Sequence, residues 1–166
     1  MPDLVDPLRR YLARRTDPAT AEDVLSDTLL VCWRRLDEIP GEPLPWAYGV
    51  ARHCLANAER ARRRHLRLVD RIFAAGARRP GPGTGDPPPH DELIDALSRL
   101  RPADAEVLRL WAWEDLGPAE IATALGVTAN AASIRLHRAK GKLRDEMRKG
   151  SGDRGHEETT TRRRRP

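Results

Sequence analysis

Apolar positions recur at helical spacing along most of the 166-residue chain. Residues three or four positions apart line one side of an amphipathic helix, so each such run predicts a helix with one buried face. Runs of this kind occupy residues 4–15, 19–36, 46–73, 92–100 and 102–113. In the second run the stripe consists of Ala21, Leu25, Thr28, Cys32 and Leu36. No segment rich in Val, Ile and Thr alternates as a strand would, so the fold is expected to be all-α.

Residues 116–144 carry the pattern of two helices around a tight turn. Gly126 supplies the tight turn, which a residue with a Cβ would resist, and Thr128 is placed to cap the second helix. The small residues Ala122 and Ala132 would let the two helices cross closely. The inward stripe of the second helix consists of Ala132, Leu136, Ala139, Leu143 and Met147. This pattern predicts a helix-turn-helix, whose second helix enters the major groove of DNA.

The composition changes abruptly at residues 74–90, AAGARRPGPGTGDPPPH. Proline and glycine at this density neither continue a helix nor bury a core, so the segment is expected to be a flexible linker. The chain is thus predicted to hold two small helical domains, at residues 1–73 and 91–149, the second being the helix-turn-helix domain. Residues 150–166 are of low complexity and are expected to form a disordered basic tail.

The charge distribution is more informative than the net charge of +5. Acids dominate residues 17–42 and bases dominate residues 52–71; acids again dominate residues 91–120 and bases residues 135–149. A single charged run usually marks a solvated helix face. The same order of signs in both halves favours two separate nucleic-acid-binding surfaces.

Several classes of protein are not expected from the sequence. No apolar run approaches the roughly 20 residues that span a bilayer, and the first residues lack a signal peptide's apolar centre. We expect a cytoplasmic protein with no membrane partner. The histidines show no metal-ligand spacing, and no glycine-rich nucleotide loop occurs, so no metal, no cofactor and no enzymatic activity are expected. Cys32 and Cys54 are expected to be reduced and partly buried.

Three segments in this order resemble a bacterial RNA polymerase sigma factor of the extracytoplasmic-function (ECF) type. They are DPATAEDVLSDTLLVCWRRL, PWAYGVARHCLANAERARRR and LSRLRPADAEVLRLWAWEDLGPAEIATALGVTANAASIRLHRAKGKLR. The resemblance covers about residues 4–73 and 91–147. It implies a region 2-like domain that binds core polymerase and the −10 promoter element, and a region 4-like domain that binds the −35 element. The implied partners are the β′ clamp helices and the β flap of core polymerase, promoter DNA and an anti-sigma factor.

The resemblance also assigns residues to each surface. The outward face of the second helix would bind core polymerase through Asp23, Ser26, Asp27, Leu30 and Arg34. The −10 element would be bound by Trp46, Arg52, His53, Asn57, Arg60, Arg62, Arg63 and Arg64, together with the loop at residues 40–45. The −35 element would be bound by Thr128, Asn130, Ser133, Ile134, Arg135, His137, Arg138, Lys140 and Lys142. Trp33 is expected to pack within its domain and Trp46 is favoured as a core residue, whereas Ile134 fits a thymine methyl and a neighbouring helix equally well.

Two other functions stay open from the sequence. One is a helix-turn-helix transcriptional regulator that acts without core polymerase, and the other is a degenerate sigma factor that only titrates its partners. The chain departs from the family pattern at His53, Asn57 and Ser133, so base preferences are not carried over. Its first helix is also about ten residues shorter than is usual in the family.

Overall fold

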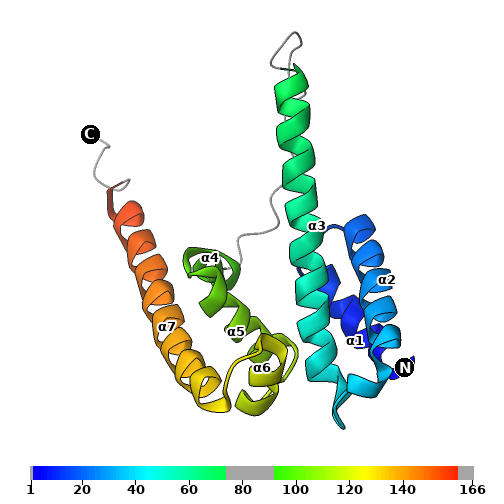
Figure 1. Ribbon diagram of the computed structural model, residues 1–166. Helices are drawn as coiled ribbons and strands as arrows, with labels where there is room; N and C mark the ends of the chain where they lie inside the picture. Colours follow the sequence, from blue (N-terminus) through cyan, green and yellow to red (C-terminus); the bar gives the residue numbers. More distant parts are fainter. Residues whose placement is uncertain (1, 74–91, 161–166) are drawn as a thin grey trace. The chain divides into compact units, whose positions relative to one another are not determined.

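The computed structural model describes residues 2–73 and 92–160, and these residues are almost entirely helical (Figure 1). The elements are α1 (Pro2–Ala13), α2 (Pro18–Arg34), the 3₁₀ turn η1 (Leu36–Glu38), α3 (Pro43–Phe73), α4 (Glu92–Arg99), α5 (Pro102–Trp113), α6 (Pro118–Leu125) and α7 (Ala129–Thr160). No strand occurs among the described residues, and the prediction of an all-α fold is confirmed.

Tertiary contacts group the helices into two compact units. Helices α1, α2 and α3 pack on one another in the first unit, and α4, α5 and α7 do so in the second. Residues Ala122–Val127 form the end of α6 and the turn that follows it. They are grouped with the first unit, whereas the residues before and after them belong to the second. The linker predicted at residues 74–90 lies outside the described residues, and the predicted domain limits stay predictions.

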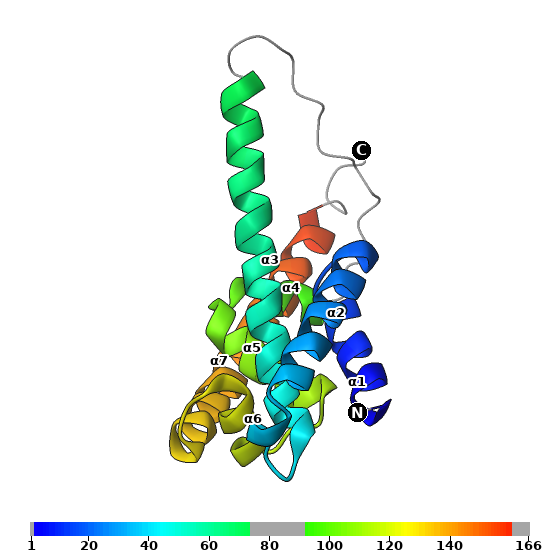
Figure 2. The same cartoon turned by 45° about the vertical axis from the view of Figure 1, so that its right-hand side comes forward.

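The core of the first unit is built from the inward stripes of its three helices. The side chains of Leu8, Tyr11 and Leu12 in α1 are at most 1% exposed. The Tyr11 ring lies 5.0 Å from that of Tyr48 in α3, which ties the two helices together through an aromatic pair. In both views α3 continues well beyond α1 and α2 (Figures 1 and 2), so its second half lies away from this core.

The predicted stripe of α2 is largely confirmed. Ala21, Leu25, Thr28 and Cys32 are buried, and Val24 joins them. The prediction is wrong for Leu36, which is 48% exposed, because α2 ends at Arg34 and Leu36 belongs to the following 3₁₀ turn. The helix begins where Asp17 caps it and Pro18 takes the first helical position, a site where no backbone N–H is needed.

The loop predicted at residues 40–45 is shorter than expected. Helix α3 begins at Pro43 and includes Pro45, which is buried. Both prolines lie in the first turn, where the backbone N–H groups have no partner within the helix, so proline does not interrupt the hydrogen bonding.

The second unit packs α4 and α5 against α7. In the inward stripe of α7, Ala132, Leu136 and Ala139 are buried as predicted. Leu143 is half-buried and Met147 is 38% exposed, so the stripe ends earlier than the spacing predicts.

Helix α7 also continues to Thr160, although the sequence predicts a disordered tail from Gly150 onwards. Each residue added to an existing helix forms a backbone hydrogen bond without a new nucleation step, so a polar sequence can prolong it. Residues 161–166 lie outside the described residues.

Candidate nucleic-acid interface

The turn between α6 and α7 has the backbone geometry that the sequence predicts. Gly126 adopts a φ of +65°, and the N–H of Val127 donates to the carbonyl of Ala122 at 3.0 Å, closing the end of α6. The Thr128 hydroxyl accepts a hydrogen bond from the N–H of Ala131 at 3.2 Å and so caps α7. One further residue, Asp115, adopts a left-handed φ of +54° in the turn that precedes α6.

Five residues form an exposed face on the first three turns of α7. They are Asn130, Ser133, Ile134, His137 and Arg138. Their spacing places them on one side of the helix, opposite the buried stripe. Ile134 is 44% exposed; of its two predicted environments, the structure thus favours the solvent-facing one. This polar face with one exposed apolar group is suited to hydrogen bonding with base edges and to contact with a thymine methyl.

Three cations assigned to the −35 element lie at the flanks of this face. Arg135 is half-buried. The Lys140 ammonium lies 3.5 Å from the centre of the Trp111 ring, a cation–π distance. Lys142 Nζ donates to the Asp104 carboxylate at 2.5 Å. The two lysines are therefore already engaged by α5.

The protruding half of α3 is strongly basic. Arg60, Arg62, Arg63 and Arg64 are all exposed. Arg60 donates to the Asn57 side chain at 2.8 Å, and Arg63 lies 3.5 Å from the Glu59 carboxylate. A row of exposed guanidinium groups on one helix can bind a phosphate backbone.

Nearer the core of the first unit, α3 carries three further −10 candidates. His53 is exposed, Arg52 and Trp46 are half-buried. The Arg35 guanidinium lies 5.6 Å from the centre of the Trp46 ring. The buried Nε atom of Arg52 finds no hydrogen-bond partner among the described residues. Trp46 is thus neither fully in the core nor free as a stacking platform.

The outward face of α2 combines acidic and apolar side chains. Asp23, Ser26, Asp27 and Arg34 are exposed, and Leu30 is 42% exposed. The expectation that Trp33 packs within the domain is wrong, because its side chain is 64% exposed. Trp33 lies three positions after Leu30 and extends the same face, a spacing that was available in the sequence.

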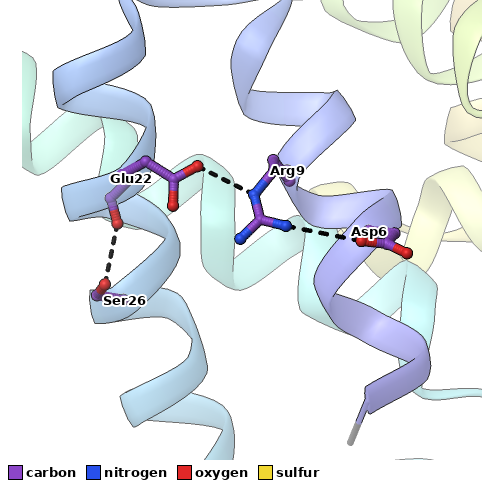
Figure 3. A network of polar contacts seen from close by, with 4 residues as sticks. All are labelled: Asp6, Arg9, Glu22 and Ser26. Carbon is purple, nitrogen blue, oxygen red and sulfur yellow. Dashed lines mark hydrogen bonds and ion pairs between the residues drawn. The ribbon is translucent and has the colours of Figure 1, made fainter.

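The neighbouring helix α1 fixes one edge of this face (Figure 3). Arg9 Nε donates to the Glu22 carboxylate at 3.0 Å, and its Nη1 atom lies 3.6 Å from Asp6. The Ser26 hydroxyl donates to the Glu22 carbonyl at 3.0 Å. The Ser26 proton is therefore used within α2. Among residues 2–73 and 92–160, no hydrogen bond or ion pair holds the carboxylates of Asp23 and Asp27.

The cysteines are free thiols, Cys32 buried and Cys54 half-buried. Burial raises the pKa of both thiols, which lowers the fraction of reactive thiolate. Within residues 2–73 and 92–160 no cluster of three metal-ligating side chains occurs. None of the helices there combines the length and apolar character that a bilayer crossing requires.

A helix-turn-helix with an exposed polar second helix, together with a separate basic helix, defines a DNA-binding transcription protein. Residues 2–65 match the family described as Sigma-70 region 2, and residues 90–143 match Sigma-70, region 4. The chain belongs to the sigma-70 family of RNA polymerase sigma factors, and within it to the ECF type.

The relatives support the same assignment. The chain is 35% identical over 147 residues to the RNA polymerase sigma factor CarQ of Myxococcus xanthus, covering 81% of this chain and 79% of CarQ. It is 33% identical over 150 residues to the ECF sigma factor SigL of Mycobacterium tuberculosis, covering 82% and 80%. The sigma factor RpoE of Bartonella quintana, solved with the anti-sigma factor NepR, shares the fold with a TM-score of 0.60 at 19% identity, over 87% of this chain and 92% of RpoE.

A second solved structure, CnrH with the cytosolic domain of CnrY, has a TM-score of 0.52 at 21% identity, over 86% of this chain and 78% of CnrH. Family membership gives the function in its general form: the chain is a sigma factor that directs RNA polymerase to promoters and so starts transcription. A regulator that acts without polymerase, or a factor that only titrates its partners, is not favoured.

Proposed function

We propose that the outward face of α2 is the surface that binds core polymerase, through the β′ clamp helices. Its residues are Asp23, Ser26, Asp27, Leu30, Trp33 and Arg34. Two carboxylates lie beside two exposed apolar side chains, Leu30 and Trp33. The carboxylates attract a basic helix and orient it, and burial of the apolar side chains supplies most of the affinity. An exposed tryptophan is a frequent energetic centre of such interfaces.

The −10 element is assigned to α3 in this proposal. The exposed guanidinium groups of Arg60, Arg62, Arg63 and Arg64 would hold phosphates. His53, Asn57, Arg52 and Trp46 lie nearer the start of the helix and would line the pockets for bases. Unstacked bases need aromatic or polar surroundings next to cations, and this end of α3 offers both.

The −35 element is assigned to the exposed face of α7. Arg138 would bond to a guanine, Asn130 to an adenine, and Ile134 would contact a thymine methyl. Ser133 and His137 complete the face, Thr128 caps the helix at the groove, and Arg135 would reach a phosphate. The second unit would also carry the contact with the β flap of polymerase.

Three general properties of the protein follow from the same proposal. The protein catalyses no reaction itself and needs no metal or cofactor, since its work is to bind. It acts in the cytoplasm, where core polymerase and promoters are found. An anti-sigma factor is proposed as a further partner, because the solved structures of RpoE and CnrH each include such a protein or a domain of one.

The observation that carries the proposal is that the exposed faces differ in chemistry. The exposed face of α2 is acidic and apolar, whereas the exposed faces of α3 and α7 are cationic or polar. The test is the double charge reversal Asp23→Lys and Asp27→Lys, measured by core-polymerase pull-down and by promoter opening. We expect core binding to be lost while the affinity of the chain for −35 duplex DNA is kept.

The matched control is Asp3→Lys with Asp145→Lys, which makes the same charge change at exposed positions outside α2. It should bind core polymerase as the wild type does. Pull-down of the α2 variant at wild-type levels would contradict the proposed surface. If the wild-type chain binds duplex DNA tightly but does not bind core polymerase, the result would support a regulator that acts without polymerase. If it binds core polymerase but opens no promoter, the result would support a factor that only titrates its partners.

A further inference from the structure

An ion pair joins the start of α5 to the middle of α7. Lys142 Nζ lies 2.5 Å from the carboxylate of Asp104, across 38 positions of sequence. The Asp104 residue is 8% exposed and, with Thr28, it is one of the two polar residues that are buried in the described part of the chain. A buried carboxylate without a partner is strongly unfavourable, so Asp104 holds Lys142 in place.

A second cation of α7 is held by the same helix. Lys140 stacks on Trp111, which lies seven positions after Asp104, two helical turns further along the same face of α5. Lys140 and Lys142 are two residues apart and therefore point about 200° apart around α7. They lie on opposite flanks of its buried stripe of Ala132, Leu136 and Ala139. Contacts on both flanks oppose rotation of α7 about its own axis.

We propose that Asp104 and Lys142 form a positioning pair that sets the orientation in which α7 presents its exposed face to the −35 element. The inference rests on the proposed −35 function of that face. The positioning pair also gives Lys142 a different role from the one that the sequence predicts: it binds Asp104 of α5 and does not neutralise a phosphate. The residues that contact DNA are then the exposed ones from Asn130 to Arg138. Lys140 and Lys142, which follow them on α7, keep these residues oriented toward the DNA.

The two roles of Lys142 predict opposite results for Asp104→Asn. If Lys142 contacted a phosphate, removal of the competing carboxylate would release the lysine and remove a negative charge near DNA, so affinity would rise. If the pair positions α7, the same change loosens the helix and affinity falls. We expect a loss of about tenfold, within the range that charged residues in one network contribute to each other.

The experiment uses the full chain assembled with core polymerase and a duplex selected by the wild-type complex from a random-sequence library. Binding is measured over a series of salt concentrations, with a duplex of scrambled −35 sequence as reference. The variants are Asp104→Asn, Lys142→Gln, Lys142→Arg and the charge exchange Asp104→Lys with Lys142→Glu. Glu146→Gln is the matched control, because it removes an acid of α7 whose partner, Lys149, lies on the same helix at 2.7 Å.

Asp104→Asn and Lys142→Gln should both weaken −35-dependent binding and leave the slope of log affinity against log salt unchanged. Lys142→Arg should restore most of the affinity, and the charge exchange should bind better than either single variant. Glu146→Gln should bind at least as well as the wild type. Circular dichroism of each chain separates loss of orientation from loss of folding. Should Asp104→Asn fail to fold, the salt slope of Lys142→Gln distinguishes the two roles, because the Lys142 side chain is 48% exposed.

Three results would overturn the positioning role: tighter binding by Asp104→Asn, a salt slope reduced by about one in Lys142→Gln, as loss of a phosphate contact gives, or weaker binding by the charge exchange than by both single variants. Failure of the wild-type complex to distinguish the selected from the scrambled −35 duplex would contradict the proposed function itself, and the positioning role with it.

Discussion

Trp33 offers the most direct test of how this sigma factor binds polymerase. The substitution Trp33→Ala removes a side chain that is 64% exposed at the end of α2. Because a tryptophan side chain carries on the order of 250 Å², about 160 Å² is available for burial by a partner. At roughly 25 cal/mol per Å², complete burial is worth at most about 4 kcal/mol.

Only part of that area term appears as affinity, since association also costs translational freedom and side-chain entropy. We therefore expect a loss of about 2 kcal/mol, the usual size for a tryptophan at the centre of an interface, which raises Kd for core polymerase about 30-fold. The free energy of unfolding should change by less than about 0.5 kcal/mol, because the side chain contributes little to the core of the free chain.

The assay is a fluorescence-anisotropy titration of the labelled chain with core polymerase. Leu66→Ala is the matched control: Leu66 is an apolar residue, 51% exposed, on the protruding part of α3. It should leave Kd within about twofold of the wild type, as expected for an apolar residue outside the interface. A Kd for Trp33→Ala that matches that of Leu66→Ala would show that α2 presents its apolar face to something other than core polymerase.

Four other substitutions test separate parts of the molecule. Arg138→Ala should cost roughly 1–3 kcal/mol at one position of the −35 element; unchanged base preference in a promoter library would refute its role. Gly126→Ala should lower stability by about 1–2 kcal/mol, measured by thermal unfolding, because φ is +65° there and nothing else crowds the Cβ. Leu8→Ala should cost about 2–5 kcal/mol, since the side chain is fully buried, and a smaller loss in urea unfolding would mean that the core relaxes around the cavity. Hydrogen bonds donated by Thr20 lower the pKa of the Asp17 carboxyl, so this cap stabilises the fold above its ordinary pKa of 3.8 and is lost as the pH falls through the lowered value. Asp17→Ala should therefore melt earlier at neutral pH but not in strong acid, and equal melting at neutral pH would count against the cap.

Much of the local structure could be predicted because it depends on neighbours in sequence. The helical spacing placed α5 correctly at Pro102–Trp113. The Gly126 turn and the Thr128 cap follow from steric and hydrogen-bonding properties of single residues. The buried stripe of α2 followed from periodicity alone until the helix ended, after which Leu36 had no fixed face.

The exposed faces of the first unit depended on tertiary packing. The sequence predicts that Trp33 packs within its domain, but the core between α1, α2 and α3 is filled by other side chains, among them Leu8, Tyr11 and Tyr48. The Trp33 side chain stays 64% exposed, and its large apolar surface is left for a partner.

The roles of the cations also required the folded structure. Periodicity places Lys140 and Lys142 on α7 but says nothing of which residues of α5 lie opposite them. Trp111 and Asp104 are far from the lysines in sequence and come close only when α5 packs on α7. The sequence by itself thus determined the helices, the turn and the family, because those depend on short-range order. Which charges face DNA and which hold the fold together was decided by packing between helices, because an ion pair forms only where the chain brings its two members together.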